Sequence, residues 1–223
     1  KFDGYQFTTY NTSNFPPLKN NGIYQTFEDN NGNIWICTNG SGLIRLDENG
    51  YEVYSSDEGI PESITVGFAD GDTIWVGSVN DGLYKIVNDK VEKITYQNLS
   101  GVTVFKVVKD HDGAIWFTTD GRGITKYFNG KYTSISLDSK KVSRVHGLYC
   151  AENGVNWIGT FEGLIKHTNN QIEFVDELKG LIVNDILEDD YGFIWMATDK
   201  GIARLNTAND AVEFLDKTRG LPG

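Results

Sequence analysis

The sequence has little sulfur, few prolines and no long apolar run. Two cysteines, one methionine and four prolines occur among 223 residues. Cys37 and Cys150 stand far outside a C-x-x-C spacing, which excludes a zinc ribbon and a thioredoxin-type motif. We expect both to be small, buried apolar side chains rather than a disulfide. No stretch approaches the ~20 apolar residues of a membrane-spanning helix. No apolar segment follows residues 1–4, so we do not expect these residues to begin a signal peptide.

Positive charge is also scarce. The chain has 20 Lys and Arg against 31 Asp and Glu, a formal net charge of -11. Binding to a phosphate backbone needs a basic surface, so DNA and RNA are not expected partners. Glycine (25 residues) and aromatic residues (13%) are abundant instead. This combination favours turn-rich β structure.

A repeat of about forty residues runs through the chain. Each copy has an acidic or Asn-Gly turn before a tryptophan, and a Gly-apolar-x-cation segment after it, as in Gly42-Leu43-Ile44-Arg45 and Gly201-Ile202-Ala203-Arg204. Such a period is typical of propellers and other repeat folds. The tryptophans, spaced 38 to 41 residues apart, are Trp35, Trp75, Trp116, Trp157 and Trp195.

Each repeat contains four short predicted strands. In the first copy they lie at residues 23–28, 33–38, 42–47 and 51–55, joined by turns at Asp29–Gly32 and Asn49-Gly50. Asn and Gly suit such turns because they tolerate positive φ. The second strand is apolar on both faces, which indicates cover on both sides. With no sustained helical periodicity, the pattern predicts an all-β fold, a β-propeller of four-stranded antiparallel blades.

At both ends of the sequence, a few residues lie outside the five predicted blades. Residues 2–10 are similar to residues 128–135, so residues 1–11 are predicted to be the outer strand of a preceding blade. Residues 219–222 match the linker at 58–61. This favours one propeller segment over residues 1–223, cut from a seven-bladed ring of about 280 residues. A five-bladed ring with a decorated edge is the alternative. Open blade edges would permit self-association. The approximate blades are residues 22–56, 63–98, 101–138, 142–177 and 181–217.

The unit Asp-x-x-Gly-x-Ile-Trp, followed by Gly-Leu-x-Arg/Lys, resembles the two-component regulator propeller repeat. The linkers Gly59-Ile60-Pro61 and Gly220-Leu221-Pro222 also resemble the Gly-Leu-Pro of that family. The resemblance covers nearly the whole chain. Blade four departs from it with Ala151 in place of the turn aspartate, and blade two with a displaced Gly71.

The resemblance implies a periplasmic or extracellular sensor region of a bacterial membrane signalling protein. Parents of this type are hybrid two-component histidine kinases, often tied to polysaccharide use, and some diguanylate cyclases. The segment itself would be non-catalytic and would pass a ligand or assembly signal to a membrane-linked kinase. Its implied partners are an oligosaccharide or other small ligand, and other propeller or signalling domains of the parent protein.

The first strand of each propeller blade is innermost, so its side chains are candidates for ligand contact. The position eleven residues before the tryptophan, shifted by one in blade two, varies from blade to blade, whereas the position before it is always Ile or Val. Aromatic faces combined with hydrogen-bonding groups suit sugars, although plain channel lining is the alternative. The predicted ligand-binding residues are Tyr24, Gln25, Lys106, Arg122, Arg144, His146, Asn184 and Asp185.

No metal, cofactor or catalytic residue is predicted. The Asp-rich turns at 29–32 and 110–113 lack the closing Glu of a calcium loop, and the three histidines have no metal-ligand spacing. We expect His111 and His167 to be solvated. A protein-interaction scaffold is one alternative function. The other is a lyase resembling virginiamycin B lyase, whose motif is similar to residues 110–118, although no matching cluster of His and Glu is found here.

Overall fold

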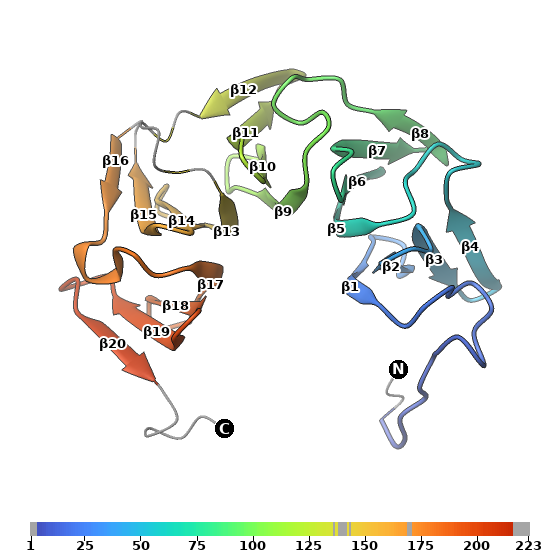
Figure 1. The fold of residues 1–223 in the computed structure, drawn as a ribbon, viewed down its shortest axis with the longest axis horizontal. Helices are drawn as coiled ribbons and strands as arrows, with labels where there is room; N and C mark the ends of the chain where they lie inside the picture. Colours follow the sequence, from blue (N-terminus) through green and yellow to red (C-terminus); the bar gives the residue numbers. More distant parts are fainter. Residues whose placement is uncertain (1–3, 136, 138–141, 143, 169–170, 216–223) are drawn as a thin grey trace. The chain divides into compact units, whose positions relative to one another are not determined.

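The computed structural model describes residues 4–135, 137, 142, 144–168 and 171–215. These residues form five four-stranded sheets, each with strands ordered along the sequence (Figure 1). All pairings within these sheets are antiparallel. This is the predicted all-β propeller architecture. Two compact units divide the chain, residues 1–95 and 96–223, and are described separately below.

The first unit contains two sheets, called blades one and two. Blade one consists of β1 (Ile23–Glu28), β2 (Ile34–Thr38), β3 (Leu43–Asp47) and β4 (Gly50–Tyr54). Blade two consists of β5 (Ile64–Asp70), β6 (Thr73–Ser78), β7 (Leu83–Val87) and β8 (Lys90–Lys93). The strands of blade one begin and end within one residue of the prediction.

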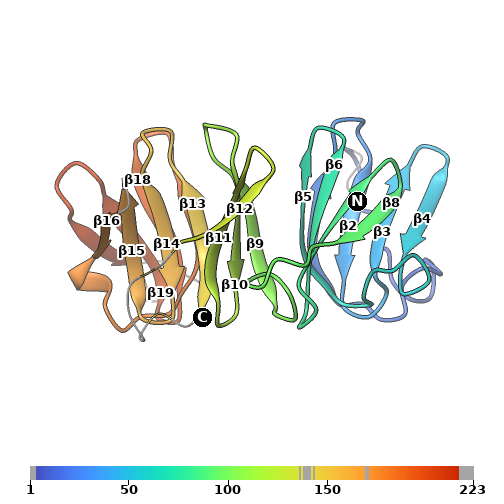
Figure 2. The same ribbon diagram turned by 90° about the horizontal axis from the view of Figure 1, so that it is seen from above.

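The second unit contains blades three, four and five (Figure 2). Blade three consists of β9 (Val104–Lys109), β10 (Ile115–Thr119), β11 (Gly123–Phe128) and β12 (Lys131–Ile135). Blade four consists of β13 (Val145–Cys150), β14 (Asn156–Thr160), β15 (Gly163–Thr168) and β16 (Gln171–Phe174). After a 3₁₀ turn, η1 (Asp176–Leu178), blade five follows with β17 (Val183–Glu188), β18 (Phe193–Thr198), β19 (Gly201–Asn206) and β20 (Val212–Leu215).

The predicted outer strand at residues 1–11 is wrong for the part that the structure describes. Residues 4–11 form no strand, only a bridge at Phe7, and Tyr5 is almost fully exposed. An outer strand needs the third strand of its own blade as a partner, and each described sheet already has four strands. The linker at 219–222 and the turn at Asn169-Asn170 lie outside the described residues.

The core of each unit lies between neighbouring sheets. In blade one, Trp35 and Cys37 of β2 are buried against blade two, and Ile36 packs on the other face beside Phe15 and Leu18. The prediction that the second strand is covered on both faces is therefore confirmed. In the second unit, one cluster joins blades three and four and another joins blades four and five. Both cysteines are free; Cys37 is fully buried and Cys150 half-buried.

In blades one, three and five, an aspartate of the turn after the first strand binds the tryptophan of the second. Asp29 Oδ2 accepts a hydrogen bond from Trp35 Nε1 at 2.8 Å, while Oδ1 accepts the N–H groups of Asn31 and Asn33. One carboxylate thus shapes the turn and anchors the indole, and the tight-turn prediction is confirmed. We call this contact the Asp–Trp clasp. The equivalent indole bonds, 2.7 Å long, join Trp116 to Asp110 and Trp195 to Asp189.

The third strand places a cation over the tryptophan. Arg45 lies directly across from Trp35 in the sheet, with its guanidinium carbon 5.7 Å from the ring centroid. Glu52 of the fourth strand pairs with the same guanidinium. Such cation–π and cross-strand contacts add modest stability in series. The same cation position is filled by Lys126 over Trp116, Lys166 over Trp157 and Arg204 over Trp195.

Replacing Asp110 with alanine should destabilise the chain. The change removes the acceptor of the buried Trp116 indole and of the Ala114 N–H. A buried donor left without a partner costs about 1–3 kcal/mol, so we expect the free energy of unfolding in urea to fall by that amount. Asp112→Ala is the matched control, because its side chain is 64% exposed against 7% for Asp110. Equal losses in the two variants would contradict the clasp.

The clasp also predicts acid sensitivity. Burial alone would raise the pKa of Asp29 and Asp110, but their hydrogen bonds outweigh it and lower the pKa below 3.8; in Asp189 the Trp195 bond dominates and lowers it too. The folded chain therefore binds fewer protons than the unfolded chain in this range. The stabilisation is complete above about pH 4 and is lost as pH falls through the folded pKa.

The test is urea unfolding measured as a function of pH. Wild type should lose stability steeply below about pH 4. The Asp29→Asn/Asp110→Asn/Asp189→Asn variant keeps an acceptor but cannot titrate at these positions, so its stability should fall less steeply. Parallel curves for the two proteins would show that the clasp carboxylates do not control acid stability.

Candidate functional site

The first strand of every blade is irregular at one position. The ladder to the second strand skips a single residue there, as in a β-bulge, and a bulge turns the skipped side chain in a new direction. The residue before it is fully buried in blades two to five, whereas Ile23 is exposed. The skipped residues are those of the predicted variable column, namely Tyr24, Thr65, Phe105, His146 and Asn184.

In the second unit this column gathers around His146. Strand β13 lies between β9 and β17 (Figure 1). The His146 ring lies 4.0 Å from the ring of Phe105 and 4.8 Å from that of Phe161, centroid to centroid. A side-chain hydrogen bond joins His146 to Asn184. The guanidinium of Arg144 lies 5.2 Å from the Phe161 centroid. Three blades therefore contribute to one cluster of aromatic and polar side chains.

Two ion pairs border this cluster. Lys106 Nζ lies 2.8 Å from Asp185 Oδ1, which links the first strands of blades three and five. Arg144 Nε lies 3.0 Å from Asp120 Oδ1. The position in blade four that corresponds to Lys106 and Asp185 is Gly147, which has no side chain. We call Phe105, Lys106, Asp120, Arg144, His146, Phe161, Asn184 and Asp185 the His146 cluster.

The electrostatics of the His146 cluster favour a neutral imidazole. Burial lowers the pKa of His146 most; Asp120 raises it, Arg144 lowers it, and the hydrogen bond with Asn184 raises it. The net pKa lies below 6.5. Both cations are already balanced by carboxylates. The cluster therefore offers aromatic faces, one neutral imidazole and exchangeable ion pairs, which suit a polar ligand without large net charge.

Three predicted residues do not join this cluster. Arg122 donates a hydrogen bond to the carbonyl of Gln97. Tyr24 and Gln25 belong to the first unit, where Tyr24 is exposed. The Gln25 side-chain oxygen accepts a 2.8 Å bond from the Gly67 N–H, which ties the first strands of blades one and two together. The Gln25 side chain thus links two neighbouring blades.

The sequence prediction missed Phe161. This residue follows the second strand of blade four, in a loop shorter than those of blades one to three. Its signal was an aromatic residue one position after the strand, where the first three blades have Asn39, Val79 and Asp120.

Of the two histidines predicted to be solvated, only His111 is exposed. His111 is exposed, with Nε2 3.1 Å from Asp112 Oδ1, as expected of a solvated turn residue. The expectation for His167 is wrong, because this residue is buried inside β15 and bonded to Asn156. Among the described residues there is no group of three His, Cys, Asp or Glu side chains able to hold a metal ion. In the same residues no helix is long and apolar enough to cross a membrane.

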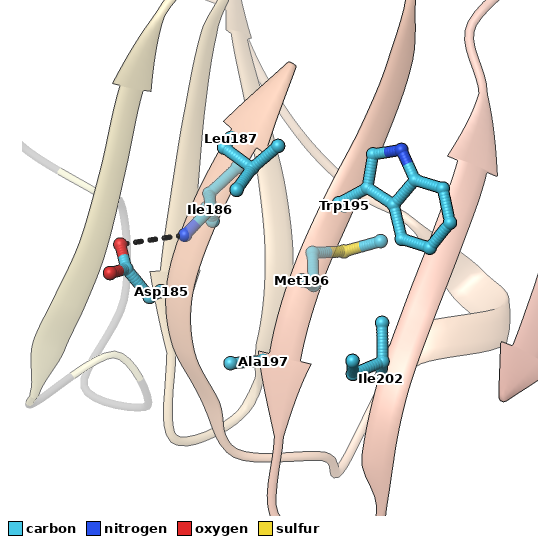
Figure 3. A pocket seen from close by; sticks show the side chains of 7 residues that line it. All are labelled: Asp185, Ile186, Leu187, Trp195, Met196, Ala197 and Ile202. Atoms are coloured by element: carbon cyan, nitrogen blue, oxygen red, sulfur yellow. Dashed lines mark hydrogen bonds between the residues drawn. The ribbon is translucent and has the colours of Figure 1, made fainter. Parts of the chain in front are cut away.

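A hollow of about 320 Å³ lies on blade five. Figure 3 shows Leu187, Trp195, Met196 and Ile202 around it, with Asp185 at one side bonded to the Ile186 N–H. Nearly all of these groups are apolar. The hollow therefore lacks the convergent polar groups that orient a polar ligand.

The repeats are similar to those of a known protein family. The model of the two-component regulator propeller matches residues 17–40 and 177–200, which hold the first two strands of blades one and five. Two of the five repeats therefore match the model of that family. The curated "Histidine kinase P4" of Formosa agariphila is 27% identical over 206 residues, covering 81% of this chain. The chain spans 15% of the length of that relative.

Solved structures share the fold. The extracellular domain of a putative hybrid two-component system of B. thetaiotaomicron has a TM-score of 0.78 and 20% identity, over 92% of this chain and 30% of that one. A catalytically inactive virginiamycin B lyase from Staphylococcus aureus, with quinupristin, has a TM-score of 0.72 and 18% identity, over 88% of this chain and 71% of that one. At such identities the likeness shows the propeller fold alone.

The charges around His146 predict opposite shifts in two variants. Arg144→Gln removes a cation that lowers the pKa of His146, so the pKa should rise. Asp120→Asn removes an anion that raises it, so the pKa should fall. Titration of the His146 ring protons by NMR measures both. Shifts of the same sign, or none, would contradict the arrangement of the cluster.

Proposed function

We propose that this chain is part of the periplasmic or extracellular sensor of a two-component signalling protein and is itself non-catalytic. The family repeats and the relationship to a histidine kinase support the setting. The observation that carries the sensor role is the His146 cluster. Three successive blades place their variable, bulged residues in contact with one another, whereas the buried valine beside each of them does not vary.

The cluster suggests how a ligand would act. Lys106–Asp185 and Arg144–Asp120 connect different blades and loops, so a polar ligand that replaces one of these pairs changes the contacts between blades. An oligosaccharide meets the requirement, because its rings can stack on Phe105 or Phe161 and its hydroxyl groups can bond His146 and Asn184. Signal transfer then requires that the ligand bind one arrangement of the blades more tightly than another.

A lyase is the second candidate. The fold is shared with virginiamycin B lyase over most of that enzyme. The chemistry of the His146 cluster favours binding instead, since its carboxylates are engaged with cations and its imidazole lies between aromatic rings. Incubation with quinupristin, followed by mass spectrometry, separates the two. The sensor proposal predicts unchanged quinupristin, and a ring-opened product would favour the lyase.

The proposal is tested on the complete parent protein in membrane vesicles. Oligosaccharides that raise the melting temperature of this chain are first identified, because a ligand of the native state must stabilise it. Such a compound should change the rate of kinase autophosphorylation by about fivefold or more. The Phe105→Ala/His146→Ala variant should lose the response, and Arg122→Ala, outside the cluster, should keep it. A stabilising compound that leaves phosphorylation unchanged would overturn the sensor role.

A further inference from the structure

Blade four departs from the other blades at two core positions. The residue before the tryptophan is isoleucine in every other blade, and it is Asn156 in blade four. The residue after the cation of the third strand is apolar or aromatic in every other blade, and it is His167 in blade four. The equivalents of Asn156 are Ile34, Ile74, Ile115 and Ile194, and those of His167 are Leu46, Ile86, Tyr127 and Leu205.

The two replacements form a pair. Asn156 and His167 are direct cross-strand partners in the sheet, and their side chains meet with Asn156 Nδ2 3.3 Å from His167 Nδ1. The residues are 9% and 5% exposed. An apolar pair would fill these positions at lower cost, because buried polar groups need partners. Two matched polar replacements at one buried site therefore point to a use beyond folding.

The pair lines a cavity of about 390 Å³ between blades three and four. This volume is within the range of small-ligand sites. Burial and the nearby Lys126 lower the pKa of His167, which favours the neutral form of its ring. Since the Asn156 amide donates to Nδ1, the neutral ring carries its proton on Nε2. Among the described residues neither His167 Nε2 nor Asn156 Oδ1 forms a hydrogen bond, so the cavity wall offers one donor and one acceptor.

The charged groups of the cavity are already paired. Lys126 Nζ lies 3.3 Å from Asp110 Oδ2 and over the ring of Trp116. Asp112 pairs with His111. The two carboxylates against one ammonium group disfavour an anionic ligand. The polar atoms of His167 and Asn156 that face the cavity suit an uncharged hydrogen-bonding group.

We propose that this cavity binds a small neutral ligand through a hydroxyl or carboxamide group. That group accepts a hydrogen bond from His167 Nε2 and donates one to Asn156 Oδ1. Trp116 and Ile135 supply apolar contact. The cavity shares no residue with the His146 cluster, so the proposal stands independently of the sensor role.

The experiment titrates the chain with glucose as the hydroxyl probe and nicotinamide as the carboxamide probe, each to about 50 mM. We expect one of them to shift the His167 ring signals in NMR and to raise the melting temperature. The Asn156→Ile/His167→Leu variant, which takes the residues of blade one or five, should lose the thermal shift. Arg122→Ala, which lies outside both this cavity and the His146 cluster, should keep it.

Two results would overturn the proposal. One is the absence of any His167 shift with both probes, which would mean that the pair holds water alone. The other is an equal thermal shift in the Asn156→Ile/His167→Leu variant, which would place binding elsewhere. If that variant does not fold, Asn156→Ala tests the same acceptor with a smaller change.

Discussion

The bond from the tryptophan indole to the turn aspartate is the contact that organises blades one, three and five. A tryptophan contributes a large apolar surface to the core, and its N–H usually finds an acceptor when buried. Asp29 supplies that acceptor from the adjoining turn and fixes the turn with its second oxygen. Blade four shows that the turn and the cation–tryptophan contact can form without the aspartate. There Ala151 keeps the backbone turn bond to Val155 without a carboxylate, and Lys166 still covers Trp157.

The two ends of the first strand therefore have different roles: one end leads into the Asp–Trp clasp, and the other carries the bulged side chain. The clasp lies at the end of the strand, and the bulge lies near its start, about one strand length away. Side chains at the bulge are released from the ladder and from the core, so they can change from Tyr24 to His146 to Asn184 without loss of the blade. The polar pair Asn156 and His167 varies for a different reason. It replaces core residues in blade four, which has no Asp–Trp clasp. Recognition and folding are thereby assigned to different residues of one repeat.

Much of the fold could be predicted from the sequence because the signals are local. Asn and Gly mark the turns, and the double-faced apolar second strand around Trp35 indicates stacked sheets. The bulge could not be predicted, since alternation of side chains gives no sign of a skipped residue. The prediction that His167 is solvated was wrong because it did not use the repeat. The equivalent residues of blades one and five are Leu46 and Leu205, which indicates a buried position. Phe161 enters the cluster through the short loop of blade four, a contact that no single-strand pattern encodes.

The exchange rate of the indole protons tests the central role of the clasp most directly. Trp35, Trp116 and Trp195 donate to aspartate, whereas the Trp157 indole donates to no group among the described residues. The clasp predicts that the first three indole protons exchange with deuterium only through large-scale unfolding, and that the Trp157 proton exchanges faster. Equal exchange rates for Trp157 and the other three would contradict it.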